Sequence, residues 1–203
     1  MGPVAARTDV RSRMVAAGED LLSQRGYGVT MLDVIAEADT PRGSIYHHFP
    51  GGKPELALEI AAKVRTEIEA YVASVARRFD EPAAFLERLV EHHCRRLTGS
   101  GYTLGCPLMG IIATGEAQST EMGTELTAAV DRAFAGWLDA ISTALAAMGL
   151  DATSSRQLAS MTVVGVEGAI VLARARRSVE PFTELARSLR LMVGAMQTAA
   201  TKE

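Results

Sequence analysis

The feature that most constrains the fold is the recurrence of apolar residues every three or four positions along almost the whole chain. One segment shows it plainly, because Leu56, Ile60, Val64, Ile68 and Val72 follow one another at intervals of four. Such spacing places these side chains on one face of an α-helix, whereas a half-buried strand would show strict alternation. We find no convincing alternating segment. The pattern therefore predicts an all-α protein of about nine helices.

Capping residues, glycines and prolines divide this pattern into separate helices. Gly26 stands where a glycine commonly ends a helix, and Thr30 precedes Asp33 at the spacing of a capping box. Thr40 is placed to cap a third helix, and Pro41 suits a first turn because its missing N–H would be unpaired there. In the first part of the chain we expect one helix up to Gly26, short helices at 31–38 and 41–48, and a long helix from about 53 to the break at 79–82. In the second part we expect a helix that carries residues 86–97, a short helix at about 107–116 and a helix that carries residues 126–148. The last two helices are expected at about 154–176 and 182–200.

Composition narrows the class of protein further. The chain has 203 residues, of which 48% are apolar and 22% charged, too apolar for a disordered tail and too charged for a membrane bundle. No run of about 18 apolar residues predicts a membrane span. Two cysteines, Cys94 and Cys106, and no visible signal peptide predict a reducing, cytoplasmic location, and we expect no disulfide between them. The net charge of −3 shows that any DNA-binding surface must be a local patch.

Residues 30–53 have the organisation of a helix-turn-helix, in which the second helix of the pair enters the major groove. The second helix, at 41–48, carries small or polar residues, and Ile45 and Phe49 can anchor it to the helices behind. No acidic residue occurs from 40 to 53, although acids outnumber bases over residues 1–60. DNA affinity would therefore depend on where the charges are placed.

Two runs, residues 26–36 and 41–56, resemble the DNA-binding domain of TetR-family transcriptional repressors. The sequence Tyr46-His47-His48-Phe49 and the Lys53-Pro-Glu-Leu ending carry most of that resemblance. The run Gly105-Cys-Pro-Leu-Met-Gly110, with residues 50–53, resembles the LmrA/YxaF-like subgroup over a shorter stretch. The resemblance implies a helix-turn-helix DNA-binding domain at 1–53 and a helical ligand-binding and dimerisation domain at 54–203.

The resemblance also implies roles for single residues. Tyr46, His47 and Lys53 match positions that hold phosphates, and Thr30 matches a cap that also touches the DNA backbone. Arg42 lies at the front of the second helix and is the best candidate to read a guanine, because a guanidinium can pair with two acceptors at once. The sequence departs from the family at Thr40-Pro41-Arg42, where a Val-Ser-Lys-like stretch is more usual, so the operator cannot be inferred. The DNA-binding candidates are Thr30, Thr40, Pro41, Arg42, Gly43, Ser44, Tyr46, His47 and Lys53.

Some of these residues have a structural alternative. Tyr46 could be an aromatic buried between helices, and Arg42 and Lys53 could be solvated surface charges. We expect His48 to pack or cap rather than to contact DNA.

The middle helices carry apolar and aromatic residues with a few polar groups, a mixture typical of small-molecule pockets. His93 would orient a ligand carbonyl or hydroxyl. Such residues also form ordinary hydrophobic cores, and the alternative that they do so here stays open. The ligand-binding candidates are Val64, Ile68, Tyr71, Leu89, His93, Met109, Ile112, Phe134, Trp137 and Leu138.

The last two helices carry heptad-like stripes that suit packing on another helix. One stripe holds Leu158, Met161, Gly165, Gly168 and Leu172, and the other is formed by Phe182, Leu185, Leu189, Met192 and Met196. Two DNA-binding domains about 34 Å apart can read the two halves of a palindrome. We therefore expect a homodimer whose four-helix interface is formed by residues at about 154–176 and 182–200. The alternative is that both stripes close the core of the monomer.

Together these features predict a transcriptional regulator, most simply a repressor released from a palindromic operator by a small apolar or aromatic effector. A DNA-binding factor without an effector, or an activator, are the alternatives. An enzyme is disfavoured, because no HExxH, P-loop or GxSxG motif is present. His92, His93 and Cys94 are adjacent on a helix and cannot converge on one ion, so we expect no catalytic residue, metal or cofactor.

Overall fold

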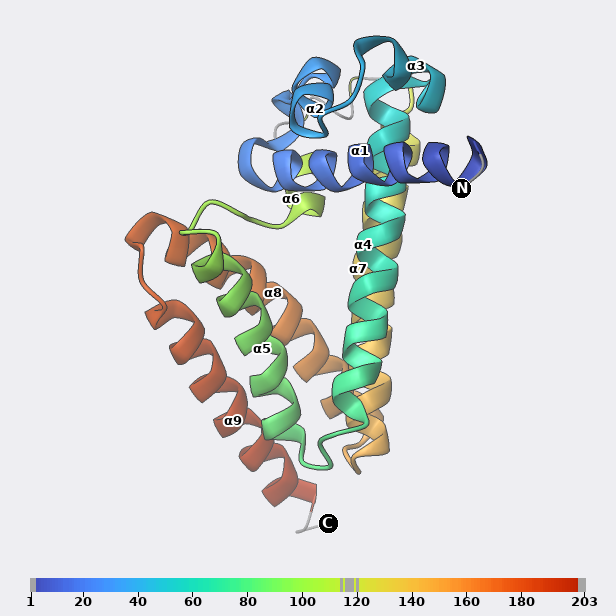
Figure 1. Cartoon of the computed structure of the whole chain (residues 1–203). Helices are drawn as coiled ribbons and strands as arrows, with labels where there is room; N and C mark the ends of the chain where they lie inside the picture. The colour runs from blue at the N-terminus through green and yellow to red at the C-terminus, as the bar shows by residue number, and fades with distance from the viewer. Residues whose placement is uncertain (1–2, 114, 116–118, 120, 201–203) are drawn as a thin grey trace. The chain divides into compact units, whose positions relative to one another are not determined.

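The computed structural model describes residues 3–113, 115, 119 and 121–200. Within these residues it contains nine α-helices, two 3₁₀ turns and no strand, which confirms the all-α prediction (Figure 1). The chain divides into two compact units. The first consists of Met1–Val64 and Gly105–Ala133, and the second of Arg65–Leu104 and Phe134–Glu203.

The first unit contains the predicted helix-turn-helix. Its elements are α1 (Pro3–Arg25), η1 (Gly26–Gly28), α2 (Met31–Glu37), η2 (Arg42–Ser44), α3 (Ile45–His48), the beginning of α4 (Gly52–Ala76), α6 (Pro107–Ile112) and the beginning of α7 (Gly123–Ala147). The largest side chains of its core are Met14, Tyr27, Ile45, Phe49 and Ile60, each at most 1% exposed.

Charged contacts hold α1 against α4 in this unit. The buried carboxylate of Glu19 accepts a hydrogen bond from Lys63 Nζ at 2.6 Å. Arg11 pairs with Glu59, and its guanidinium lies 4.7 Å from the centroid of the Phe49 ring. Because Phe49 follows α3 directly, these contacts help to fix the predicted recognition segment to its support.

The helix α6 docks on the last turns of α1, where backbone carbonyls have no partner within the helix. The Gly105 N–H donates to the Ser23 carbonyl at 2.9 Å. A Cβ on Gly110 would collide with the Leu22 carbonyl oxygen, so only glycine permits this approach. The sequence predicted α6 to extend to about residue 116, but the helix ends at Ile112 and Gly115 has a φ of +71°. Residues 114 and 116 lie outside the described residues.

The second unit consists of the remainders of α4 and α7 with α5 (Pro82–Gly99), α8 (Ala152–Arg176) and α9 (Glu180–Ala200). The helices α5, α8 and α9 pack against one another (Figure 1). Glu81 caps α5 by accepting from the N–H groups of Ala83 and Ala84, and Asp151 caps α8 in the same way. Arg177, in the left-handed conformation, ends α8.

The heptad stripes of α8 and α9 do not form a single exposed seam as the sequence predicted. Leu158, Phe182 and Leu189 are at most 3% exposed and belong to the core of the second unit. Gly165 faces the Leu185 side chain, which would collide with a Cβ there. The alternative that the stripes close the monomer core is therefore correct for these residues, because α8 and α9 use this spacing to pack on each other and on α5.

By length and composition, α8 is the one described helix that could cross a membrane. However, 39% of its most apolar window is buried within the protein. A core helix meets the same criterion, so this apolar composition is weak evidence for a membrane span.

Candidate functional site

The start of α2 is held by the predicted capping box. The Asp33 N–H donates to Thr30 Oγ1 at 3.2 Å, and the Asp33 carboxylate accepts from the Thr30 N–H at 2.8 Å and from its hydroxyl at 2.6 Å. These hydrogen bonds, with a smaller contribution from Arg25, lower the pKa of Asp33 below its usual value. The negative charge therefore lies at the positive end of the α2 dipole, where it stabilises the helix.

The turn between α2 and the next segment is fixed by α1. Arg13 Nη1 donates to the carbonyls of Ala38 at 3.2 Å and Asp39 at 3.3 Å, which lie at the C-terminal end of α2. Asp39 has a φ of +48°, in the left-handed region that a tight turn often needs. The two halves of the helix-turn-helix thus have a defined geometry.

The predicted recognition helix consists of the turn η2 followed by α3. Ile45 and Phe49 are completely buried, so they anchor the segment as predicted. Arg42, Tyr46 and His47 are exposed, and 62% of Tyr46 is accessible to solvent. The alternative that Tyr46 is a buried aromatic is therefore wrong. Gly43 is also exposed, and His48 is half-buried with its ring against His47 at 5.5 Å.

The beginning of this segment differs from the prediction. Thr40 does not cap a helix, and its buried Oγ1 makes no hydrogen bond among the described residues. Pro41 occupies the cap position of η2, and Ser44 Oγ donates back to the Pro41 carbonyl at 2.6 Å. The prediction failed because the recognition segment begins with a 3₁₀ turn rather than with an α-helix. In this turn the Pro41 carbonyl accepts from both the N–H and the hydroxyl of Ser44.

Lys53 is held in place by a residue that the sequence did not single out. Its Nζ donates to the Tyr27 carbonyl at 2.7 Å and lies 4.1 Å from the centroid of the Tyr27 ring. The contact ties the start of α4 to η1. The run Gly26-Tyr-Gly, which indicated a helix end and formed part of the family resemblance, therefore also supplies the acceptor for this lysine.

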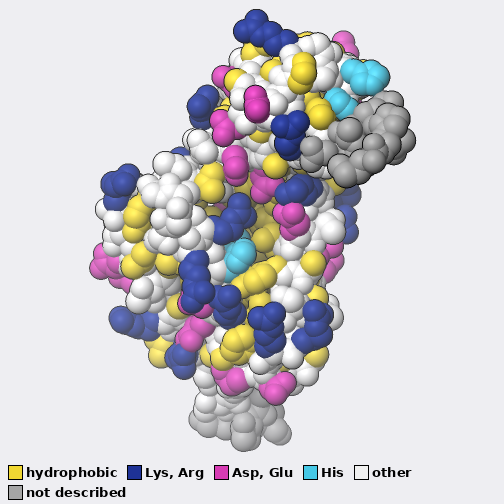
Figure 2. All heavy atoms as spheres, viewed as in Figure 1, with side chains coloured by type: hydrophobic (Ala, Val, Ile, Leu, Met, Phe, Trp, Pro, Cys, Tyr) yellow, Lys and Arg dark blue, Asp and Glu magenta, His cyan; other side chains and the backbone are white. Residues whose placement is uncertain are grey.

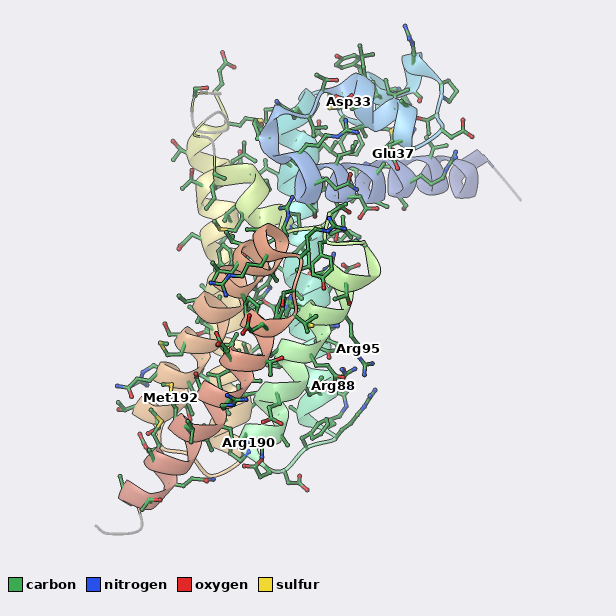
Figure 3. All side chains as sticks on the ribbon, turned by 90° about the vertical axis from the view of Figure 1, so that its left-hand side faces the viewer. Asp33, Glu37, Arg88, Arg95, Arg190 and Met192 are labelled. Carbon is green, nitrogen blue, oxygen red and sulfur yellow. The ribbon has the colours of Figure 1, made fainter. Side chains whose placement is uncertain are left out.

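The charges around the helix-turn-helix are mixed in sign. On the face drawn in Figure 2, Lys and Arg side chains are interspersed with Asp and Glu side chains around α1 and α2. Asp33 and Glu37 both lie on α2 (Figure 3). No acidic residue occurs in η2 or α3, so the exposed side chains of Arg42, Tyr46 and His47 form the part of the helix-turn-helix best suited to a phosphate backbone.

The second unit contains a partly open cavity of about 30 Å³. A cavity of this volume has room for only a few water molecules, so a drug-sized ligand would have to displace the lining side chains. Apolar side chains from α4, α5, α7 and α8 form most of the wall. The lining residues are Ile68, Tyr71, Val72, Leu89, His93, Trp137, Ile141, Thr162, Val163, Val166 and Glu167.

The polar groups of the lining differ in whether they already have partners. Thr162 Oγ1 donates to the Leu158 carbonyl at 2.7 Å, and the Tyr71 hydroxyl donates to the Arg88 carbonyl at 3.4 Å. Trp137 is 5% exposed, and its buried Nε1 has no hydrogen-bond partner among the described residues. Burial, with smaller contributions from His92 and Arg96, lowers the pKa of His93 to about 3, so its imidazole is neutral at pH 7.

Half of the predicted ligand-binding residues line this cavity, namely Ile68, Tyr71, Leu89, His93 and Trp137. Phe134 does not line it, but its ring packs edge-on against Trp137 at 5.2 Å. Leu138 is absent from the lining, and Val64, Met109 and Ile112 belong to the first unit. The sequence reasoning missed the contribution of α8 (Thr162, Val163, Val166 and Glu167), because it assigned the whole helix to the dimer interface.

A surface of exposed apolar residues remains on α8 and α9. Val164 is 65% exposed, Val171 63% and Leu191 69%, with Met161 and Leu172 also prominent. A Cβ on Gly168 or Gly194 would meet no atom within 4 Å. Met192 and Arg190 lie on the same helix as Leu191 (Figure 3). Monomeric proteins rarely expose so many large apolar side chains together.

The neighbouring His92, His93 and Cys94 do not assemble a metal site. His92 stacks on the Tyr71 ring at 4.0 Å, and neither Cys94 nor Cys106 is part of a disulfide. Among the described residues, no group of three His, Cys, Asp or Glu side chains is placed to hold a metal ion.

Comparison with known proteins places these features in context. Residues 14–60 match the family of bacterial regulatory proteins of the tetR type, and residues 82–188 match the C-terminal domain of LmrA/YxaF-like transcriptional regulators. An uncharacterised HTH-type transcriptional regulator of Mycobacterium tuberculosis is 31% identical over 182 residues, which cover 89% of this chain and 92% of that protein.

Two further comparisons agree with this match. The HTH-type transcriptional regulator LmrA of Bacillus subtilis is 24% identical over 87% of this chain and 93% of its own length. The crystal structure of a TetR transcriptional regulator from Legionella pneumophila matches with a TM-score of 0.76 and 20% identity, covering 88% of this chain and 94% of that one. The relatives are named as transcriptional regulators rather than enzymes.

Proposed function

The chain belongs to the TetR family of transcriptional regulators, which bind DNA as dimers and respond to small molecules, and we propose that it is a repressor released from a palindromic operator by a small apolar or aromatic effector. The observation that carries the proposal is the exposed face of Arg42, Tyr46 and His47 on a segment anchored by Ile45 and Phe49. We assign DNA binding to residues 1–53 and ligand binding and dimerisation to residues 54–203.

In this proposal some of the residues of η2 and α3 contact DNA bases and others contact phosphates. Arg42, Gly43 and Ser44 meet base edges, with Thr40 and Pro41 shaping their approach, whereas Tyr46 and His47 hold phosphates. Lys53 already donates to Tyr27, but an ammonium has three donors, so it can hold η1 in place and contact a phosphate at once. Thr30 contributes mainly through its cap on α2, since its hydroxyl is paired with Asp33.

Dimerisation supplies the second reading head. We assign the interface to the exposed apolar face of α8 and α9, which contains Met161, Val164, Leu172 and Leu191. Gly168 and Gly194 lie on the same helices without neighbours within 4 Å, so a second backbone can approach closely there. The partner in this interface is a second copy of this chain. We place the protein in the cytoplasm, because that is where the operator DNA is.

The effector site in this proposal is the cavity of the second unit. A ligand much larger than 30 Å³ requires its wall to move, and α4 and α7 each contribute residues to both compact units. Ligand binding would therefore favour a conformation that differs from the one that binds DNA. The shift in DNA affinity cannot exceed the difference in ligand affinity between the two conformations.

The single tryptophan of the chain allows both events to be followed in one sample. Trp137 lines the cavity, so its fluorescence reports ligand occupancy, while the anisotropy of a labelled duplex reports DNA binding. We expect DNA release to follow occupancy for any compound that binds. Saturation of the fluorescence signal by every binding compound without DNA release would refute ligand control.

The DNA-binding role is tested separately with Arg42→Ala and a matched control, Arg77→Ala, which removes the same charge from an exposed position just after α4. We expect weaker operator binding for Arg42→Ala and little change for Arg77→Ala. Equal operator affinities for wild type and Arg42→Ala would contradict the assignment. In vitro transcription from an operator-bearing promoter distinguishes a repressor from an activator by the sign of the effect.

A further inference from the structure

One residue of the cavity wall in the second unit carries a buried hydrogen-bond donor that has no partner among the described residues. Trp137 is 95% buried, lines the cavity and has no acceptor for its indole N–H among the described residues. A buried donor without a partner costs stability, and native proteins rarely leave one unpaired. An acceptor supplied from outside the chain would relieve that cost.

The other polar groups of the lining limit the kinds of ligand that the cavity can pair with. The hydroxyls of Thr162 and Tyr71 already donate to backbone carbonyls, so they offer only acceptor capacity. The neutral imidazole of His93 has one donor and one acceptor nitrogen. Glu167 already has an interaction partner within the protein. Apart from the imidazole of His93, the indole N–H is thus a fixed donor in a wall that is otherwise apolar or already paired.

The same wall disfavours charged ligands. Ile68, Val72, Leu89, Ile141 and Val166 are apolar and at most 8% exposed. Moving an ion from water against such side chains is costly unless an opposite charge pairs with it. No lysine or arginine is among the lining residues, and Glu167 is the only carboxylate there.

From these observations we infer that the cavity recognises compact, uncharged ligands through an acceptor oxygen, such as a ketone, that pairs with the Trp137 Nε1–H. This inference rests on the proposed ligand site and adds its chemical selectivity. Trp137 acts as the specificity-determining residue, and the apolar wall excludes ionic analogues of the same shape.

Four small probes of nearly equal shape test the inference on the full-length protein. Acetophenone offers a neutral carbonyl, cumene has a methyl group in place of the carbonyl oxygen, and benzoate and benzamidine offer an anion and a cation. Calorimetry should show acetophenone binding about five to ten times more tightly than cumene, as expected for pairing one buried donor. Benzoate and protonated benzamidine should bind at least tenfold more weakly than acetophenone.

Removing the donor should remove the preference. Trp137→Phe keeps an aromatic ring, and replacing the single tryptophan by 3-benzothienylalanine keeps the bicyclic shape without the N–H. In both proteins the ratio of acetophenone to cumene affinity should fall to about one. In wild type, the one indole N–H signal in a ¹H–¹⁵N spectrum should move downfield with acetophenone and much less with cumene.

The outcomes separate this inference from the proposed function. Equal affinity for acetophenone and cumene, a preference that survives both tryptophan replacements, tighter binding of a charged probe, or no binding of any probe at millimolar concentration would each overturn it. A ketone preference with no effect on operator binding would leave the inference standing and contradict ligand-controlled release. DNA release by compounds that show no acceptor preference would contradict the inference and support ligand-controlled release.

Discussion

The contact between α6 and α1 allows one prediction to be worked out in detail. Gly110 packs so closely on α1 that a Cβ would overlap the Leu22 carbonyl oxygen. The obstructing atom belongs to a helix backbone and cannot rotate away as the end of a side chain would. Gly110→Ala therefore forces α6 and the end of α1 apart.

The magnitude follows from this geometry. Overpacking a well-packed site costs about 1–3 kcal/mol, and the rigid backbone obstacle places this substitution toward the upper end. The helix propensity of alanine returns at most about 1 kcal/mol. We therefore expect the free energy of unfolding to fall by about 2 kcal/mol and the melting temperature by roughly 4–8 °C for a chain of this size.

Urea denaturation followed by circular dichroism measures this change, with the protein concentration held fixed because we propose that the protein is a dimer. Gly28→Ala is the matched control in the same unit, since its Cβ would meet no atom within 4 Å and its φ is not positive. Hydrogen exchange of the Gly105 N–H, which donates to Ser23, should also become faster in Gly110→Ala. If Gly110→Ala were as stable as Gly28→Ala, the account of this interface would be wrong.

Three further predictions concern the DNA interface and the cavity. Arg42→Ala should relax the base preference at one operator position by about 1–3 kcal/mol, seen in anisotropy titrations with single-base operator variants; an equal loss on operator and random DNA would contradict base reading. Lys53→Met should lower the free energy of unfolding by about 1–2 kcal/mol, because a charged hydrogen bond and a cation–π contact are lost. It should also reduce the slope of log affinity against log salt by about one, and an unchanged slope would exclude a phosphate contact. The pKa of His93 is about 3 in the folded protein against about 6.5 when unfolded, so the unfolded state binds the extra proton and stability falls as pH decreases from about 6.5 toward 3. His93→Gln should flatten that part of the urea stability profile, and an identical pH dependence in both proteins would contradict the buried neutral imidazole.

Local signals predicted much of the fold, because they act within a few residues. The capping box of Thr30 and Asp33 forms as the sequence predicted. Ile45 and Phe49 anchor the recognition segment because their spacing puts both on its buried side. The long helices begin and end near the predicted residues, since their caps and breaks are encoded in the local sequence.

Features that depend on contacts between distant residues were not predictable in the same way. The spacing on α8 and α9 showed that both helices are amphipathic, but it could not show that Leu158 and Leu189 pack within the chain while Val164 and Leu191 remain exposed. Nor could it show that Thr162 lines a cavity.

The same limit applies to the first unit. Gly105 and Gly110 suggested a family resemblance, but only the fold shows that they bring α6 against the end of α1. Tyr27 had no obvious role in the sequence until its carbonyl was found to hold Lys53. Such pairs are separated by many residues, and a single sequence does not specify which partners meet.

Selection of bound fragments from a random duplex library by the full-length protein tests the central claim most directly. Two reading segments related by a two-fold axis should enrich an inverted repeat whose half-site centres are about 10 base pairs apart, or a whole multiple of that distance. Failure to enrich any sequence at low salt, or enrichment of single half-sites by a strictly monomeric protein, would contradict the account.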